Sequence, residues 1–222
     1  MARRRVLLGG IAWIATGQYF LANVLAASRW SDPAYDFRRD TISSLGETSC
    51  AAVTGGTRAC SPWHAAANVS WIATGLAMVI GALLTAPAFP AGLNGDRDRW
   101  SRLGLWLVVA NGVGLAIVGL NPDDVRPGPH VVGAVLSLVG GNLALVALGV
   151  ALRRAGQWRW LGTAGLAAGI TGLTSLAVMR TSTGDTGLFE RIAGDPVVAW
   201  YFVCGIVVVR ACGNRPPQPS AP

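Results

Sequence analysis

Residues 131–152, VVGAVLSLVGGNLALVALGVAL, decide the fold, and no charged side chain occurs among them. A helix needs about 20 mostly apolar residues to cross the hydrocarbon core of a bilayer. Apolar residues fall on all sides of this run, whereas a surface helix of a soluble protein keeps one polar face. The stretch therefore predicts a transmembrane helix.

Four further runs have the same character, at 6–27, 65–86, 103–120 and 160–179. A sixth apolar run, at 196–209, is short by itself and becomes long enough to span when it is extended to 190–209. The chain has 222 residues, of which 13% are charged, against about 25% in a typical soluble domain. The first run is longer than the core of a signal peptide, so we expect a retained helix. The sequence predicts an all-α protein, a polytopic bundle of six transmembrane helices. We expect one membrane domain over residues 1–215 and a disordered Pro-rich tail at 216–222.

The arginine residues predict how the helices are oriented. All 18 basic residues are Arg. If the N-terminus is cytoplasmic, the cytoplasmic segments hold eleven Arg and two acids, and the other face holds seven Arg and nine acids. Cytoplasmic loops are enriched in basic residues, so we expect both termini in the cytoplasm and a multi-pass protein of the cell membrane. No basic face forms, which argues against nucleic acid as a partner.

Both His residues and most acids fall in the loops of the predicted exterior face. These loops cover about 28–64, 121–130 and 180–195. If such groups converge, they can carry out general acid–base chemistry. The candidate catalytic residues are Asp40, His64, Asp123, His130 and Glu190.

Other loop residues have structural interpretations. Asp40 has the position of a cap for a short helix that begins near Ser43. Ser44 and Glu47 have the spacing of a capping box, so we expect Ser43, Ser44 and Glu47 to serve local structure. Cys50 and Cys60 predict a structural disulfide in an oxidising exterior. The spacing of His and Cys predicts neither a metal site nor a cofactor.

Polar residues inside the apolar runs require partners. Asn111 and Asn142 each lie near the middle of a run, and we expect their side chains to bond to each other. Asp195 and Pro196 are suited to the start of the last helix, with Asp as its cap and Pro in its first turn.

Several short motifs, in order, resemble a family of six-span prokaryotic membrane proteins catalogued as domain of unknown function 998. The motifs are Asp40-Thr41-Ile42-Ser43-Ser44-Leu45-Gly46, Ser61-Pro62-Trp63-His64 with Asn68, Gly119-Leu120-Asn121-Pro122-Asp123-Asp124 leading to His130, Gly141-Asn142-Leu143, and Gly187-Leu188-Phe189-Glu190-Arg191 with Trp200. The resemblance covers nearly the whole chain and implies the fold and topology. The chain also resembles small integral-membrane terpene cyclases in its size and in the acidic residues of its predicted exterior face. This is a likeness of protein class and involves no shared motif.

Two functions follow from these residues. The first is an intramembrane enzyme that acts by acid–base chemistry on a lipid-soluble substrate, with membrane lipids around it. Lipid hydrolysis requires His130 or His64 to activate water or Ser43, and isoprenoid cyclisation requires protonated Asp40 or Glu190 beside a Trp-rich cavity. The second is a non-catalytic role in lipid binding, in transport or as a subunit of a complex, in which the same polar residues hold the loops together.

Overall fold

A computed structural model describes residues 2–30, 33–52, 58–89, 98–182 and 184–213. The predicted tail at 216–222 lies outside the described residues. The longer helices are α1 (Ala2–Ala15), α2 (Gln18–Ser28), α3 (His64–Thr85), α4 (Arg99–Leu120), α5 (Pro127–Arg154), α6 (Arg159–Met179) and α7 (Thr186–Gly213). The short elements are the 3-10 helices η1 (Ser43–Gly46) and η2 (Ala86–Ala88) and the antiparallel strands β1 (Ala51–Ala52) and β2 (Arg58–Ala59).

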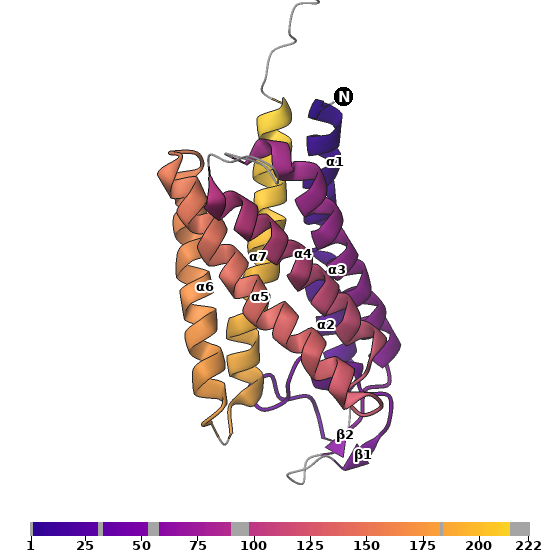
Figure 1. The fold of residues 1–222 in the computed structure, drawn as a ribbon. Helices are drawn as coiled ribbons and strands as arrows, with labels where there is room; N and C mark the ends of the chain where they lie inside the picture. The colour runs from indigo at the N-terminus through magenta and orange to yellow at the C-terminus, as the bar shows by residue number, and fades with distance from the viewer. Residues whose placement is uncertain (1, 31–32, 53–57, 90–97, 183, 214–222) are drawn as a thin grey trace, which may run out of the picture.

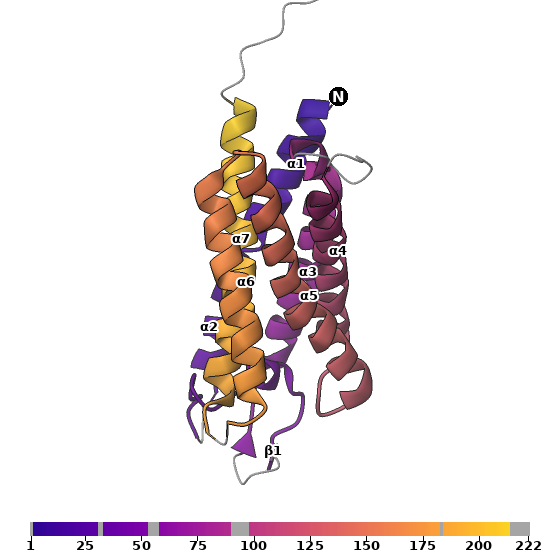
Figure 2. The same cartoon turned by 60° about the vertical axis from the view of Figure 1, so that its left-hand side comes forward.

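Six helical segments of the described chain are long and apolar enough to cross a membrane, with α1 and α2 together forming the first. Each span packs against the next in sequence, and α1 also packs against α7. The six spans therefore close into a ring, which is the elongated bundle of Figures 1 and 2. The predicted all-α bundle of six membrane helices is confirmed.

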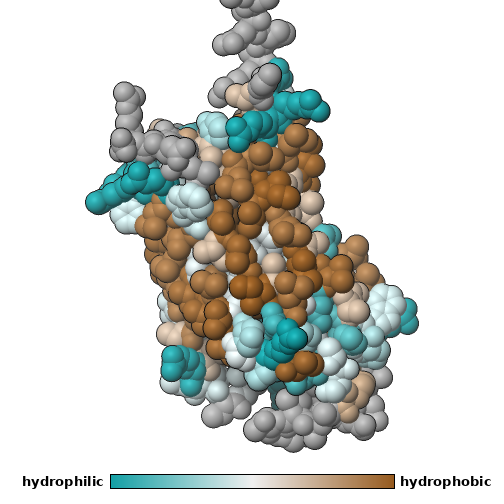
Figure 3. All heavy atoms as spheres, turned by 45° about the vertical axis from the view of Figure 1, so that its right-hand side comes forward, coloured by the Kyte–Doolittle hydropathy of each residue, from teal (hydrophilic) through white to brown (hydrophobic). Residues whose placement is uncertain are grey.

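The surface divides into an apolar band and two polar ends. In Figure 3, hydrophobic side chains cover the middle of the visible face and hydrophilic ones gather above and below it. The start of α1 and the end of α7 lie at the same end of the bundle. The opposite end, here called the loop end, carries the β1–β2 hairpin and the α4–α5 and α6–α7 connections.

The first span is interrupted, although the sequence predicts one continuous helix there. Thr16 and Gly17 separate α1 from α2, and their amides bond to the carbonyls of Trp13 and Ile14, three residues back. The Thr16 hydroxyl also donates to the Trp13 carbonyl at 2.6 Å, and such back-bonding bends helices. After the break, Tyr19 at the start of α2 is buried, and its hydroxyl bonds to Asp195 of α7.

The last span begins earlier than the Asp195–Pro196 cap that the sequence predicts. Helix α7 starts at Thr186 and runs for 28 residues with Pro196 inside it. Asp195 does not cap a helix, because its carboxylate accepts a hydrogen bond from the Tyr19 hydroxyl at 3.2 Å. Packing of the extended helix against α1 and α6 outweighs the local preference of proline for a first turn.

The two mid-span asparagines do not bond to each other, contrary to the prediction. Asn111 of α4 donates to the Ser137 carbonyl of α5 at 2.8 Å. Asn142 of α5 donates to the Ala193 carbonyl of α7 at 2.8 Å. Each amide thus finds a backbone carbonyl on a neighbouring helix, and the two together tie α4, α5 and α7.

Close backbone contact joins α3 to α4. A Cβ atom added to Gly75 would lie 2.3 Å from the Gly112 carbonyl oxygen, and one added to Gly112 would lie 2.5 Å from the Gly75 carbonyl oxygen. Small residues let membrane helices approach in this way, so that dispersion contacts can form along both backbones.

The substitution Gly75→Ala should force α3 and α4 apart and lower the free energy of unfolding by about 1–3 kcal/mol. Thermal unfolding of the purified protein in detergent measures this. The matched control is Gly128→Ala at the start of α5, where an added Cβ meets nothing within 4 Å. If both variants unfold at the same temperature, the α3–α4 contact does not limit stability.

Candidate functional site

The candidate site is built on the segment between α2 and α3, which folds back over the loop end of the bundle. Residues 36–40 form a tight turn, in which the Asp40 amide donates to the Asp36 carbonyl at 2.8 Å. The Asp40 carboxylate accepts the Asp36 amide at 2.7 Å and so closes the same turn. Asp40 therefore shapes the loop rather than joining the cluster described below.

The start of α7 holds this turn in place. The Leu188 amide donates to the Arg38 carbonyl at 2.9 Å, and the Thr186 hydroxyl donates to the Arg39 carbonyl at 2.9 Å. A Cβ atom on Gly187 would lie 2.2 Å from the Asp40 carbonyl oxygen, so this position requires glycine. The loop and α7 are thus in backbone contact, which explains the Gly-Leu-Phe-Glu pattern.

The N-cap residue of η1 is Ile42, and the side chain that bonds to the amides of η1 is that of Thr41 and not that of Asp40. The Ser44 amide donates to the Thr41 hydroxyl at 3.2 Å, and the Ser44 hydroxyl donates to the Thr41 carbonyl at 2.7 Å. The predicted Asp40 cap and the capping box of Ser44 with Glu47 are therefore wrong. The bonds of Thr41 leave the Ser43 side chain available for other partners.

Ser43 stands between His130 and Glu190. Its hydroxyl oxygen lies 3.0 Å from His130 Nε2 and 3.2 Å from Glu190 Oε1. The second Glu190 oxygen accepts the Ile42 amide at 2.7 Å, and His130 Nδ1 lies 2.8 Å from the Asn121 carbonyl oxygen. We call these four groups, Ser43, His130, Glu190 and the Asn121 carbonyl, the Ser43 cluster. It joins η1, α5, α7 and the end of α4.

The hydrogen-bond partners assign the tautomer of His130. A backbone carbonyl only accepts hydrogen bonds, so Nδ1 must carry the proton that bonds to Asn121. In neutral His130, Nε2 is then an acceptor that faces the Ser43 hydroxyl. This is the arrangement in which an imidazole removes a proton from a serine.

The Ser43 cluster also holds a definite number of protons. Two hydrogen bonds meet at the Ser43 oxygen, one to His130 and one to Glu190, and each needs a proton. The hydroxyl supplies one of them. The other must sit on His130 Nε2 or on the Glu190 carboxyl, because no further donor takes part. The cluster can therefore pass a proton between the two side chains through Ser43.

A partly open cavity adjoins the cluster. It has a volume of about 50 Å³, and Ser43 and Glu190 line it at the loop end. Its wall is mostly apolar and includes Ile42, Trp71 and Leu138. His130 and Glu190 are 3% and 7% exposed, so bulk water has little access to them.

The other predicted site residues lie outside the Ser43 cluster. His64 is the first residue of α3, and its ring has no polar partner in the described part of the chain. Asp123 is half-buried in the α4–α5 connection, where none of the described side chains bonds to it. Two of the five predicted residues, His130 and Glu190, are thus brought together by the fold.

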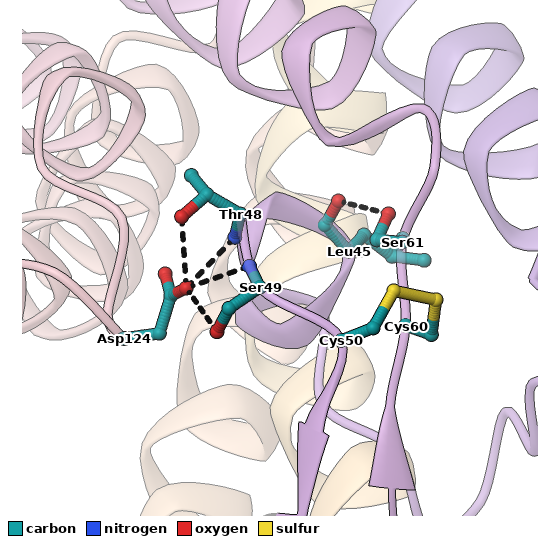
Figure 4. The surroundings of a disulfide bond; sticks show 7 residues. All are labelled: Leu45, Thr48, Ser49, Cys50, Cys60, Ser61 and Asp124. Atoms are coloured by element: carbon teal, nitrogen blue, oxygen red, sulfur yellow. Dashed lines mark hydrogen bonds between the residues drawn. A yellow bond between two sulfur atoms is a disulfide. The ribbon is translucent and has the colours of Figure 1, made fainter.

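The neighbouring Asp124 anchors the long loop instead. One of its carboxylate oxygens accepts four hydrogen bonds at 2.9 Å, from the amides and hydroxyls of Thr48 and Ser49 (Figure 4). Burial disfavours the charged form, but these bonds outweigh it and lower the pKa of Asp124. The Cys50–Cys60 disulfide, which follows directly, is present as predicted.

Ser43 is absent from the predicted catalytic residues, because the sequence favours a local structural role for it and indicates it only as a group that His130 or His64 could activate in lipid hydrolysis. A serine in a loop rich in Ser and Thr has the composition of a turn, so the pattern favours local structure. The Asn121 carbonyl could not be predicted as a site group from the sequence, because every residue has a backbone carbonyl. The signal that was available is the pair of His130 and Glu190, which the chain places at the starts of α5 and α7.

The fold and the cluster define a class, an integral membrane protein of six spans with a buried Ser–His–Glu arrangement beneath one polar end. The chain belongs to the family described as "Protein of unknown function (DUF998)", whose model matches residues 13–207. The match includes all members of the Ser43 cluster. Neither a curated protein nor a solved structure matches the chain.

Glu47 is a second buried carboxyl group at the loop end, beside the cluster. It is 9% exposed. Burial, together with the nearby charges of Asp124, Asp123 and Asp40, raises the pKa of Glu47 to about 7. A carboxyl group whose pKa is raised on folding supports the fold when protonated, and this contribution is lost as the pH rises from about 4.5 through 7.

The substitution Glu47→Gln should therefore stabilise the protein at pH 8, by about 1–3 kcal/mol, and leave it nearly unchanged at pH 4. Thermal unfolding of wild type and variant in the same detergent at the two pH values gives the difference. An equal difference at both values would mean that the charge of Glu47 is not what the substitution removes.

Proposed function

We propose that this protein is a membrane-embedded serine hydrolase that cleaves an ester of a lipid-soluble substrate. The observation that carries the proposal is the position of the Ser43 oxygen, 3.0 Å from an imidazole nitrogen and at the mouth of an apolar cavity. A hydroxyl group needs such a base to become a nucleophile at neutral pH. The surrounding bilayer supplies lipids as candidate substrates.

In the first half of the reaction, the Ser43 oxygen attacks the ester carbonyl carbon while its proton passes to His130 Nε2. The tetrahedral intermediate collapses, the alcohol leaves with the proton from His130, and the acyl group remains on Ser43. In the second half, water attacks the acyl-serine, and His130 again accepts a proton and returns it to Ser43. The sum is ester plus water to acid plus alcohol, which balances.

Glu190 and Asn121 are positioning residues in this scheme. Glu190 accepts the Ile42 amide at 2.7 Å through one oxygen, and in the protonated form that leaves His130 Nε2 free to accept, its carboxyl group donates to the Ser43 oxygen at 3.2 Å. It thus fixes the backbone and side chain of the nucleophile together. The Asn121 carbonyl holds the His130 ring at 2.8 Å and stabilises its protonated form as it develops.

Isoprenoid cyclisation is the second candidate, since Glu190 and Trp71 line the same cavity. A protonated Glu190 would start that reaction, and the face of Trp71 would stabilise a carbocation. Hydrolysis is favoured because Glu190 already bonds to Ile42 and Ser43, whereas His130 Nε2 meets only the nucleophile. The third candidate is a non-catalytic protein, in which the Ser43 cluster only holds the loop against the helix bundle.

We further propose that both termini are cytoplasmic and that the Ser43 cluster lies at the exterior face of the cell membrane. The support is the distribution of eleven Arg and two acids on the side of the termini, against seven Arg and nine acids on the loop side. The disulfide at the loop end agrees with an oxidising exterior.

The substitution Ser43→Ala should lower kcat for a lipid-like p-nitrophenyl ester by about 10²–10⁴-fold, and His130→Ala should do the same. The matched control is Ser44→Ala, because the Ser44 hydroxyl only bonds to the Thr41 carbonyl. A fluorophosphonate probe should label wild type and Ser44→Ala at Ser43, as mass spectrometry can locate. Ester turnover that survives Ser43→Ala would overturn the hydrolase proposal. Turnover of a polyprenyl substrate that is lost only in Glu190→Gln would establish the cyclase instead.

A membrane-impermeant maleimide tests the orientation in intact cells, in a Cys212→Ser background. Val125→Cys, in the exposed α4–α5 connection, should be labelled at once. Ala155→Cys, in the exposed α5–α6 connection, should be labelled only after the cells are opened. The reverse pattern would place the Ser43 cluster in the cytoplasm.

A further inference from the structure

An open groove lies at the end of the bundle opposite the Ser43 cluster, here called the terminus end. Helix α4 begins there and α5 ends there, at the same end as the start of α1 (Figure 1). The groove runs along the first two turns of α4 and has a volume of about 500 Å³, which is in the size range of small-molecule sites. Its lining residues are Arg99, Trp100, Arg102, Leu103 and Trp106.

Two guanidinium groups from different helices meet the ring of Trp100. The guanidinium carbon of Arg99 lies 5.5 Å from the centre of this ring, and that of Arg154, at the end of α5, lies 5.7 Å from it. Both arginine side chains are exposed. Stacking on an aromatic ring engages the flat face of a guanidinium group, so the N–H donors at its edge stay available for an anion.

The described part of the chain offers no carboxylate to balance these charges. Both ion pairs formed by the described residues lie at the loop end. At the terminus end the described residues include a single acid, Asp98, whose carboxylate caps α4 by accepting the Trp100 and Ser101 amides. The same end carries nine described Arg, three in α1, two each in α4 and α5, and one each in α6 and α7. This end therefore attracts anions from outside the described chain.

The deeper part of the groove is apolar. Leu103 and Trp106 are 49% and 51% exposed. They follow Arg99 by four and seven residues, so they lie on the same face of α4, about 6 and 10 Å further into the bilayer. Arg102, three residues after Arg99, adds a second guanidinium group at the mouth. A charged mouth above an apolar wall has the amphipathic order of a phospholipid, whose phosphate precedes its acyl chains.

We propose that this groove binds an anionic phospholipid, with the phosphate at Arg99 and Arg102 and an acyl chain against Leu103 and Trp106. Arg154 adds positive charge from the neighbouring helix. With the termini in the cytoplasm, the groove opens to the cytoplasmic leaflet, which carries a negative surface potential from its anionic lipids. The site is separate from the Ser43 cluster and does not depend on the proposed hydrolase function.

The test compares three probes on the purified full-length protein in a neutral detergent. These probes are dioleoylphosphatidylglycerol, dioleoylphosphatidylcholine and inorganic phosphate, and shifts of the unfolding temperature give their dissociation constants. Wild type should bind phosphatidylglycerol about tenfold more tightly than phosphatidylcholine, because each arginine near an anionic lipid contributes a factor of about five. Inorganic phosphate at the same concentration should give no shift, since it cannot use the apolar wall.

The substitution Arg99→Gln should weaken phosphatidylglycerol binding about fivefold and leave phosphatidylcholine binding unchanged. Arg154→Gln should act in the same direction and is the second variant. The matched control is Arg210→Gln, which removes one exposed charge at the same end, in the last turn of α7 and outside the groove, and should change either affinity less than twofold.

Trp106→Ala should weaken the binding of both lipids to the same extent, because both press an acyl chain against it. Equal affinities of wild type for the two lipids, or equal losses in Arg99→Gln and Arg210→Gln, would overturn the proposal in favour of an unspecific attraction by the charged end. A shift with inorganic phosphate as large as that with phosphatidylglycerol would overturn it in favour of a site for soluble anions.

Discussion

The bond between the Glu190 carboxylate and the Ile42 amide is the contact on which the loop end depends. It joins residues 148 positions apart and is 2.7 Å long. Through it, a side chain of the last membrane helix fixes the backbone of the first loop, immediately before Ser43. The apolar surroundings strengthen this bond, since water does not compete for either partner. The bonds of Thr186 and Leu188 to the Arg39 and Arg38 carbonyls hold the same loop against the same helix.

The fold could be predicted from the sequence to a large extent because a bilayer imposes a simple requirement. Backbone groups in lipid must bond within their own segment, so long apolar runs such as 131–152 become helices. Two local features of the helices do not follow from this requirement. The break at Thr16 results from a hydroxyl that bonds to its own backbone, and α7 continues through Pro196 because neighbouring helices hold it. The continuation of α7 depends on packing that no single run of residues specifies.

The site was predicted in part. His130 and Glu190 lie at the starts of long helices, so their place at the loop end follows from the helix positions alone. Asp40, His64 and Asp123 share that end, but the loop conformation directs their side chains elsewhere. A sequence shows which residues share one face of the membrane. It does not show which of them turn inward, because that is decided by contacts such as Asp124 with Thr48.

The contact of α1 with α7, which closes the ring, has a consequence for biosynthesis. Membrane helices enter the bilayer in the order of translation, so Ser43 is synthesised before His130 and Glu190, the residues that bond to it. His130 arrives with the fourth span, and Glu190 only with the sixth. Ser43 and His130 are thus both present after the fourth span, and the Ser43 cluster is complete only when the sixth span brings Glu190.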